Sequence, residues 1–106
     1  MLENHILMHC TTPDRGSAET LARRLVEDRL VACVNIVPGV TSVFRWEGKV
    51  EEEPEHLLII KTTAGQFEKV KECIVANHPY ELAEIIAMPI THASPDYLKW
   101  LTENSK

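Results

Sequence analysis

The chain has 106 residues, of which 44% are hydrophobic and 25% are charged, as in an ordinary globular domain large enough to bury a core. Sixteen acidic residues against eleven basic ones give a net charge of -5, which argues against the concentrated basic surface that nucleic acids and anionic membranes require. We therefore expect a single domain over residues 1–106 that binds neither nucleic acid nor membrane.

The sequence also bears on the compartment of the protein. No stretch approaches the roughly eighteen apolar residues that span a bilayer, and the first ten residues lack a basic segment followed by a long apolar run. The three cysteines, Cys10, Cys33 and Cys73, are odd in number and widely spaced, so they indicate neither a disulfide framework nor a zinc site. We expect a cytoplasmic protein with reduced thiols.

The first third of the chain predicts a strand, a helix and a second strand. Residues 4–11 contain a short apolar run that is typical of a buried strand. Thr12 and Pro13 offer a helix cap with proline at the first helical position. Residues 31–37 are rich in β-branched side chains and predict the next strand. Apolar residues at helical spacing separate the two strands: Ala18, Leu21, Ala22, Leu25 and Leu30.

A long hairpin is predicted to follow. Pro38 and Gly39 interrupt the second strand and indicate a bulge or bend, beyond which alternation places Phe44 and Trp46 on one face. Glu47-Gly48 can form a two-residue hairpin loop, and the return strand covers residues 49–63. Its acidic run, residues 51–55, is most simply a solvated strand edge protected by charge and proline, and the alternative is a cation site.

The last part of the chain predicts a helix, an edge strand and a short final helix. Residues 64–77 show helical spacing and end at His78-Pro79. After a loop over residues 80–84, the strand predicted over residues 85–91 contains Pro89, which places it at a sheet edge. Ser94 and Pro95 can start the last helix, with a predicted buried face of Tyr97, Leu98 and Leu101, and Trp100 alongside.

This order of elements is the α+β, ferredoxin-like βαββαβ arrangement with an extra C-terminal helix. The two hairpin strands of some fifteen residues would each measure about 50 Å, against a radius of gyration near 13 Å for a domain of this size. The hairpin should therefore overhang the domain. Because unpaired strand edges and exposed rings invite pairing with other copies, we predict a homo-oligomer closed as a trimer or dimer.

Three segments, IVPGVTSVFRWEGKVEEEPE, IIKTT and HPYELAEI, resemble the CutA family of divalent-cation-tolerance proteins, and the resemblance extends from Ile6 to Leu101. It implies a ferredoxin-like subunit in a tight homotrimer with the architecture of the PII nitrogen-signalling proteins. It also implies a part in tolerance to copper and other divalent cations. No enzyme activity is implied, and animal relatives are associated with anchoring of acetylcholinesterase.

The resemblance implies Cys10 and His78 as metal ligands, with copper as the ion. Family members with two adjacent histidines before Pro-Tyr have a histidine where this chain has Asn77, and asparagine is a poor ligand for a soft ion. Met8 shares a strand face with Cys10 and could add a second sulfur. The alternative is that both sulfurs pack in the core. Two further departures from the family pattern are Ala83 for a proline and Phe44 for a tyrosine.

A second candidate site is a polar and aromatic group at the expected subunit seam, here called the seam cluster. It could form a pocket for a small ligand or anion, or a hydrogen-bonded network between subunits. No nucleophile motif or glycine-rich phosphate loop is present, so we expect no enzyme. The leading hypothesis is a copper-binding homotrimer, and the alternative is a PII-like sensor or protein-anchoring scaffold. The seam cluster comprises Phe44, Trp46, Lys61, Thr62, Tyr80, Glu81 and Glu84.

Overall fold

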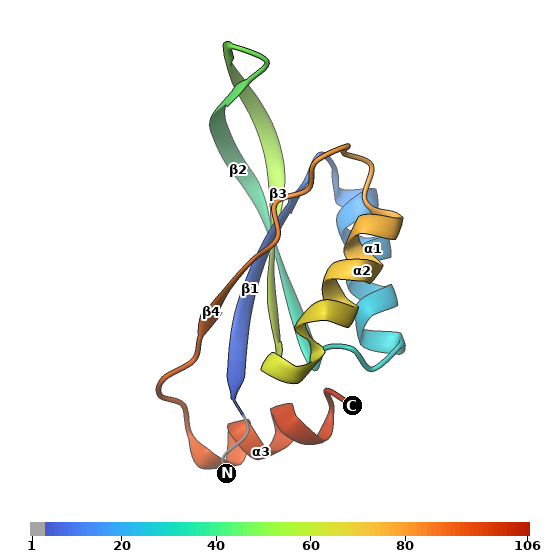
Figure 1. The fold of residues 1–106 in the computed structure, drawn as a ribbon, viewed down its shortest axis with the longest axis vertical. Helices are drawn as coiled ribbons and strands as arrows, with labels where there is room; N and C mark the ends of the chain where they lie inside the picture. The colour runs from blue at the N-terminus through green and yellow to red at the C-terminus, as the bar shows by residue number, and fades with distance from the viewer. Residues whose placement is uncertain (1–3) are drawn as a thin grey trace.

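The structure, a computed structural model, describes residues 4–106 and shows a four-stranded antiparallel sheet in the order β2-β3-β1-β4. This is the predicted ferredoxin-like order of elements with its additional C-terminal helix, α3 (Figure 1). A 3-10 turn, Ala64–Gln66, precedes the second helix within the segment predicted as one helix. The strands are β1 (His5–Thr12), β2 (Cys33–Trp46), β3 (Lys49–Thr63) and β4 (Ile86–Pro89), and the helices are α1 (Arg15–Glu27), α2 (Phe67–Asn77) and α3 (Pro95–Glu103).

The core lies between one face of the sheet and the two helices α1 and α2, which lie side by side in Figure 1. Along β1, every second side chain is buried against these helices, including Met8 and Cys10. Both sulfurs are therefore part of the hydrophobic core, as one of the two interpretations of these residues expected. The other buried members include Ile6, Ala18, Leu21, Leu25, Leu58, Ile60, Val70 and Ile74.

The other face of the sheet, here called the open face, is not covered by α1 or α2. The strand registers place Leu7, Ile59 and Met88 on it, at the centre and toward the β4 edge. Met88 and its neighbour on the same face, Ile86, are exposed. The helix α3 lies across the end of the sheet where β1 begins (Figure 1), and there the His5 Nε2 atom is 2.7 Å from Thr102 Oγ1.

The hairpin overhang is confirmed. β1 ends at Thr12, opposite His56, and beyond that pair β3 continues with β2 as its partner (Figure 1). At the same level the β2–β3 register shifts between Val37 and Val40, and Gly39 has a φ of 76°, so the predicted bulge marks the point where the hairpin leaves the sheet. The molecule is accordingly elongated, with extents of 46 × 25 × 23 Å.

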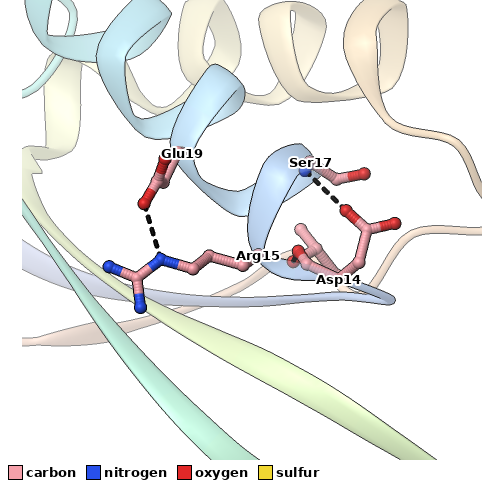
Figure 2. Close-up of polar contacts among 5 residues, drawn as sticks. Asp14, Arg15, Ser17 and Glu19 are labelled. Carbon is pink, nitrogen blue, oxygen red and sulfur yellow. Dashed lines mark hydrogen bonds and ion pairs between the residues drawn. The ribbon is translucent and has the colours of Figure 1, made fainter.

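The start of α1 differs from the prediction. Thr12 is the last residue of β1 and Pro13 precedes the helix cap, which is Asp14. Figure 2 shows the Asp14 carboxylate accepting a hydrogen bond from the Ser17 backbone N–H, at 2.7 Å. Because an aspartate in this position satisfies one of the free N–H groups of the first turn, the strand can extend to Thr12 and the helix starts two residues later than predicted.

The last helix starts as predicted but buries a narrower face. Ser94 caps it, with Pro95 in the first turn. Within the helix Leu101 is fully buried, whereas Tyr97 and Trp100 are exposed and their rings lie against each other at 5.5 Å. Apolar spacing thus located the helix but did not determine which side chains reach the core.

Candidate functional site

Cys10 lies near the end of β1 on the helix-covered face and has no exposed surface. Burial, and to a smaller extent the nearby carboxylates of Glu84 and Glu55, raise the pKa of its thiol to about 12, because both effects disfavour a thiolate. The thiol points toward the Thr11 carbonyl oxygen, 3.9 Å from the sulfur. At neutral pH it is therefore a protonated, sheltered sulfur.

His78 follows the last residue of α2, where the backbone turns extended ahead of Pro79. Its Nδ1 atom accepts a hydrogen bond from the Tyr80 backbone N–H at 3.0 Å, and its Nε2 atom is 2.7 Å from the Thr11 carbonyl oxygen. Since Nδ1 accepts a hydrogen bond, the ring proton resides on Nε2 and is donated to Thr11. Both ring nitrogens thus have partners, and the ring ties the end of α2 to the end of β1.

The structure brings Cys10 and His78 together, because the thiol and the imidazole approach the same Thr11 carbonyl oxygen. The side-chain amide of the preceding residue, Asn77, donates a hydrogen bond to the Cys73 carbonyl oxygen at 2.7 Å. Within residues 4–106, no group of three or more His, Cys, Asp or Glu side chains is arranged to hold a metal ion. To bind a metal ion, the Cys10 thiol would have to lose its proton and the His78 imidazole would have to lose a hydrogen bond.

A buried carboxylate lies next to this pair. Glu55 is only 6% exposed and accepts a hydrogen bond from the Tyr80 hydroxyl at 2.8 Å. Burial, and then the hydrogen bond to Glu55 and its charge, raise the pKa of Tyr80 to about 12. The Tyr80 ring also lies 5.0 Å from the His78 ring. The segment after α2 is therefore attached both to β1 and to the base of the hairpin.

Glu55 corrects the interpretation of residues 51–55 as a solvated edge. Glu52 and Glu53 are exposed as expected, but Glu55 is covered where β1 has ended and the segment from α2 to β4 crosses over (Figure 1). Its neighbour His56 has a buried Nδ1 atom with no hydrogen-bond partner among the described residues. Sequence reasoning missed both residues. The one available signal was alternation from Ile59 and Leu57, which puts Glu55 on the same face as those apolar residues.

Within one chain the seam cluster divides into three groups. Phe44 and Trp46 lie on the overhang, 40% and 39% exposed. Lys61 and Thr62 lie six or seven residues along β3 from Glu55, which is about 20 Å. They point to opposite faces: Lys61 Nζ donates to Asn35 Oδ1 at 2.6 Å, whereas the Thr62 hydroxyl donates to the Leu30 carbonyl. The third group, Tyr80, Glu81 and Glu84, lies in the segment between α2 and β4.

The bulge determines which of these residues share a face. Val37 pairs with Leu57 and Val40 with Glu55, so both valines lie on the same face although they are three residues apart. Consequently Phe44 and Trp46 continue the open face rather than the helix-covered face. Lys61, the buried Glu55 and the two rings therefore lie along one continuous surface of β2 and β3.

Among the described residues, no helix is both long and apolar enough to cross a membrane. The three cysteines are free thiols.

Comparison with known proteins gives a consistent result. Residues 6–104 match the family model described as CutA1 divalent ion tolerance protein. The divalent-cation tolerance protein CutA of Thermus thermophilus is 53% identical over 95 residues, which cover 90% of this chain and 92% of that protein. The corresponding protein of Escherichia coli is 41% identical over 96 residues, covering 91% of this chain and 86% of that one.

Solved structures agree in fold over nearly the whole length. A divalent cation tolerance protein (Cut A1) from Thermus thermophilus superposes with a TM-score of 0.94 at 49% identity, covering 96% of this chain and 99% of that chain. CutA1 from Oryza sativa superposes with a TM-score of 0.96 at 40% identity, covering 98% and 95%.

Proposed function

Because the chain belongs to the CutA1 family of divalent ion tolerance proteins, we propose that it is a homotrimeric, cytoplasmic protein that binds copper through Cys10 and His78 and catalyses no reaction. The observation that carries the metal proposal is the approach of both side chains to the Thr11 carbonyl oxygen. The names of the relatives, which refer to cation tolerance and to no reaction, support binding rather than catalysis. Three free thiols are consistent with a reducing compartment.

Copper binding at this site would depend on the protonation of Cys10 and on the hydrogen bonds of His78. A thiolate and a neutral imidazole are good ligands for copper, but the Cys10 thiol is protonated and the His78 imidazole is hydrogen-bonded through both nitrogens. Copper binding would displace the thiol proton and break the contact between His78 and Thr11. Since the pKa of Cys10 is about 12, the affinity should rise by up to about tenfold per pH unit across the neutral range.

The trimer part of the proposal is supported by the overhanging hairpin and the open face. Both present apolar surface, including Val37, Met88 and Trp46, that a second copy could cover. Beyond His56 the β3 strand has lost its β1 neighbour, so its outer edge could accept a strand. A cyclic trimer would close these contacts without forming an open filament.

Copper titration by calorimetry tests the metal site. Cys10→Ala and His78→Ala are each expected to lower the affinity at least about tenfold, because each would remove one of two ligands. Cys33→Ala and His92→Ala are the matched controls, since they delete a thiol and an imidazole elsewhere in the chain. Equal copper affinity in the wild type and in the two site variants, or no rise in affinity between pH 6 and pH 8, would contradict the site.

A second candidate is a PII-like sensor or anchoring scaffold with a small-anion site at the subunit seam. It is favoured by the continuous face that carries Lys61 and the two hairpin rings. A thermal-shift screen of phosphorylated and carboxylate metabolites distinguishes the two candidates, because a bound ligand raises the apparent stability. A shift produced by an anion and abolished in Lys61→Gln would favour the sensor. A shift produced by copper alone would favour the metal site.

A further inference from the structure

Arg29 has a backbone conformation that is unusual for an arginine. It follows the C-cap residue of α1, Asp28, and its φ of 59° lies in the left-handed region. The Arg29 N–H donates to the Val26 carbonyl oxygen at 3.0 Å. The Leu30 N–H donates to the Leu25 carbonyl oxygen at 3.1 Å, and the two bonds together form a Schellman motif. Because glycine has no Cβ to clash at this position, helix termination alone would favour glycine over arginine here.

The Arg29 side chain connects the end of α1 to the end of α3. Its Nε atom donates a hydrogen bond to the Lys106 backbone oxygen at 2.7 Å, and its Nη2 atom donates to the Glu103 carbonyl oxygen at 3.0 Å. The last carbonyl groups of a helix lack partners within the helix and lie at the negative end of its dipole. The rigid fork of a guanidinium can bind two such acceptors at once. Figure 1 shows the C-terminal end of the chain close to the turn between α1 and β2.

The helix α3 is otherwise attached at few points. Among residues 4–106, the core cluster between the sheet, α1 and α2 includes no residue of α3, and within the helix the one buried side chain is Leu101. Gln66 Nε2 donates to the Ser105 carbonyl oxygen at 2.8 Å, and His5 contacts Thr102. Like the Arg29 contacts, these two lie at the C-terminal half of the helix or just beyond it.

We propose that α3 and residues 104–106 open and close as one unit about the connection formed by residues 90–94, and that Arg29 is the clasp that holds this unit closed. Because the core cluster has no member from α3, the unit can leave the end of the sheet while the strands, α1 and α2 stay folded. Opening breaks both guanidinium hydrogen bonds and exposes Leu101.

Opening of α3 also changes a groove at this end of the sheet. The groove has a volume of about 1020 Å³ and lies between β4 and α3, with Met88 and Pro89 on one side and Leu98 and Thr102 on the other. When α3 leaves, the groove loses one wall, so the clasp controls whether the groove exists. Arg29 is exposed and follows α1, on the helix-covered side of the sheet. The proposal rests neither on the metal site nor on the homotrimer.

Hydrogen–deuterium exchange of the assembled protein, followed on peptides from α3 and from β1, tests the proposal. Arg29→Gly removes the guanidinium but supplies the residue that the end of α1 favours, so this variant is expected to fold. Its α3 amides should exchange at least about tenfold faster than those of the wild type, whereas its β1 amides should exchange no faster. Trypsin should also cleave after Lys99 faster in this variant, because cleavage requires the open helix.

Two further variants separate the clasp from a general effect of charge. Arg29→Lys keeps the charge without the fork and should give an intermediate exchange rate in α3. Arg23→Gln removes another exposed arginine from α1 and should match the wild type. The proposal is overturned if Arg29→Gly leaves exchange and cleavage of α3 at wild-type rates, if exchange in β1 rises together with that in α3, or if Arg23→Gln accelerates exchange in α3 equally.

Discussion

Trp46→Ala is expected to dissociate the proposed homotrimer, weakening it by at least about 2 kcal/mol, the range typical of a buried interface aromatic. Trp46 lies on the overhang, where within its own chain it remains 39% exposed. It shares its face with Phe44 and with the apolar residues of the open face. A copy packed against this surface would therefore cover the indole ring together with the sheet.

Sedimentation velocity over a range of dilutions measures this effect. Val43→Ala is the matched control, because Val43 lies on the same strand but on the opposite face of the hairpin and is 65% exposed. It should leave the association constant close to that of the wild type. An undisturbed trimer in Trp46→Ala, or dissociation to the same extent in Val43→Ala, would show that the rings do not form the interface.

The free energy of unfolding is expected to fall steeply at alkaline pH. The pKa of Cys10 is about 12 in the folded chain, against about 8.5 in an unfolded one. The folded state thus holds the thiol proton more tightly. This contribution to stability is complete below about pH 8.5 and is lost as the pH rises toward 12, by up to about 1.4 kcal/mol per pH unit and roughly 5 kcal/mol in all. Tyr80 acts in the same direction between about pH 10 and pH 12.

Urea denaturation at pH 7, 9, 10 and 11 checks this expectation. Cys10→Ala should flatten the decline between pH 9 and pH 11, whereas Met8→Leu should retain the wild-type slope, because it perturbs the same core without removing a titrating group. Tyr80→Phe should flatten the upper end of the range. If Cys10→Ala and the wild type lose stability in parallel, burial of the thiol is not what couples folding to alkaline pH.

The features that were predictable from sequence depend on a few adjacent residues. Glu47 and Gly48 form the predicted hairpin loop, with φ values of 50° and 79°, because glycine readily adopts the positive φ that this loop needs. Ser94 with Pro95 marks the start of α3 for a similarly local reason. The helix cap at Asp14 was missed because Thr12 before Pro13 has the local pattern of a cap, and only the pairing of β1 shows that Thr12 still belongs to the strand.

The features that could not be predicted depend on contacts between distant segments. Burial of Glu55 requires that β1 end at Thr12 and that Tyr80, twenty-five residues further along the chain, cross the base of the hairpin. The hydrogen bonds of His78 likewise depend on where the end of α2 meets β1. The spacing of residues along the sequence predicts neither the burial of Glu55 nor the hydrogen bonds of His78. The sequence could therefore suggest a histidine and a cysteine as ligands, but not their protonation states or hydrogen-bond partners.

The bulge at Pro38 and Gly39 affects the direction of the hairpin, whereas the pairing on either side of it determines which side chains share a face. Between the two flanking register pairs, Val37 with Leu57 and Val40 with Glu55, β3 has one residue, His56, whereas β2 has two, Pro38 and Gly39. Removing Gly39 would therefore restore a regular ladder without altering any pairing on either side, and the same side chains would project from a straighter arm. A single deletion would thus change the tilt of the overhang while its side chains stayed the same, so in the proposed trimer the angle between neighbouring copies would vary independently of the residues at their contacts.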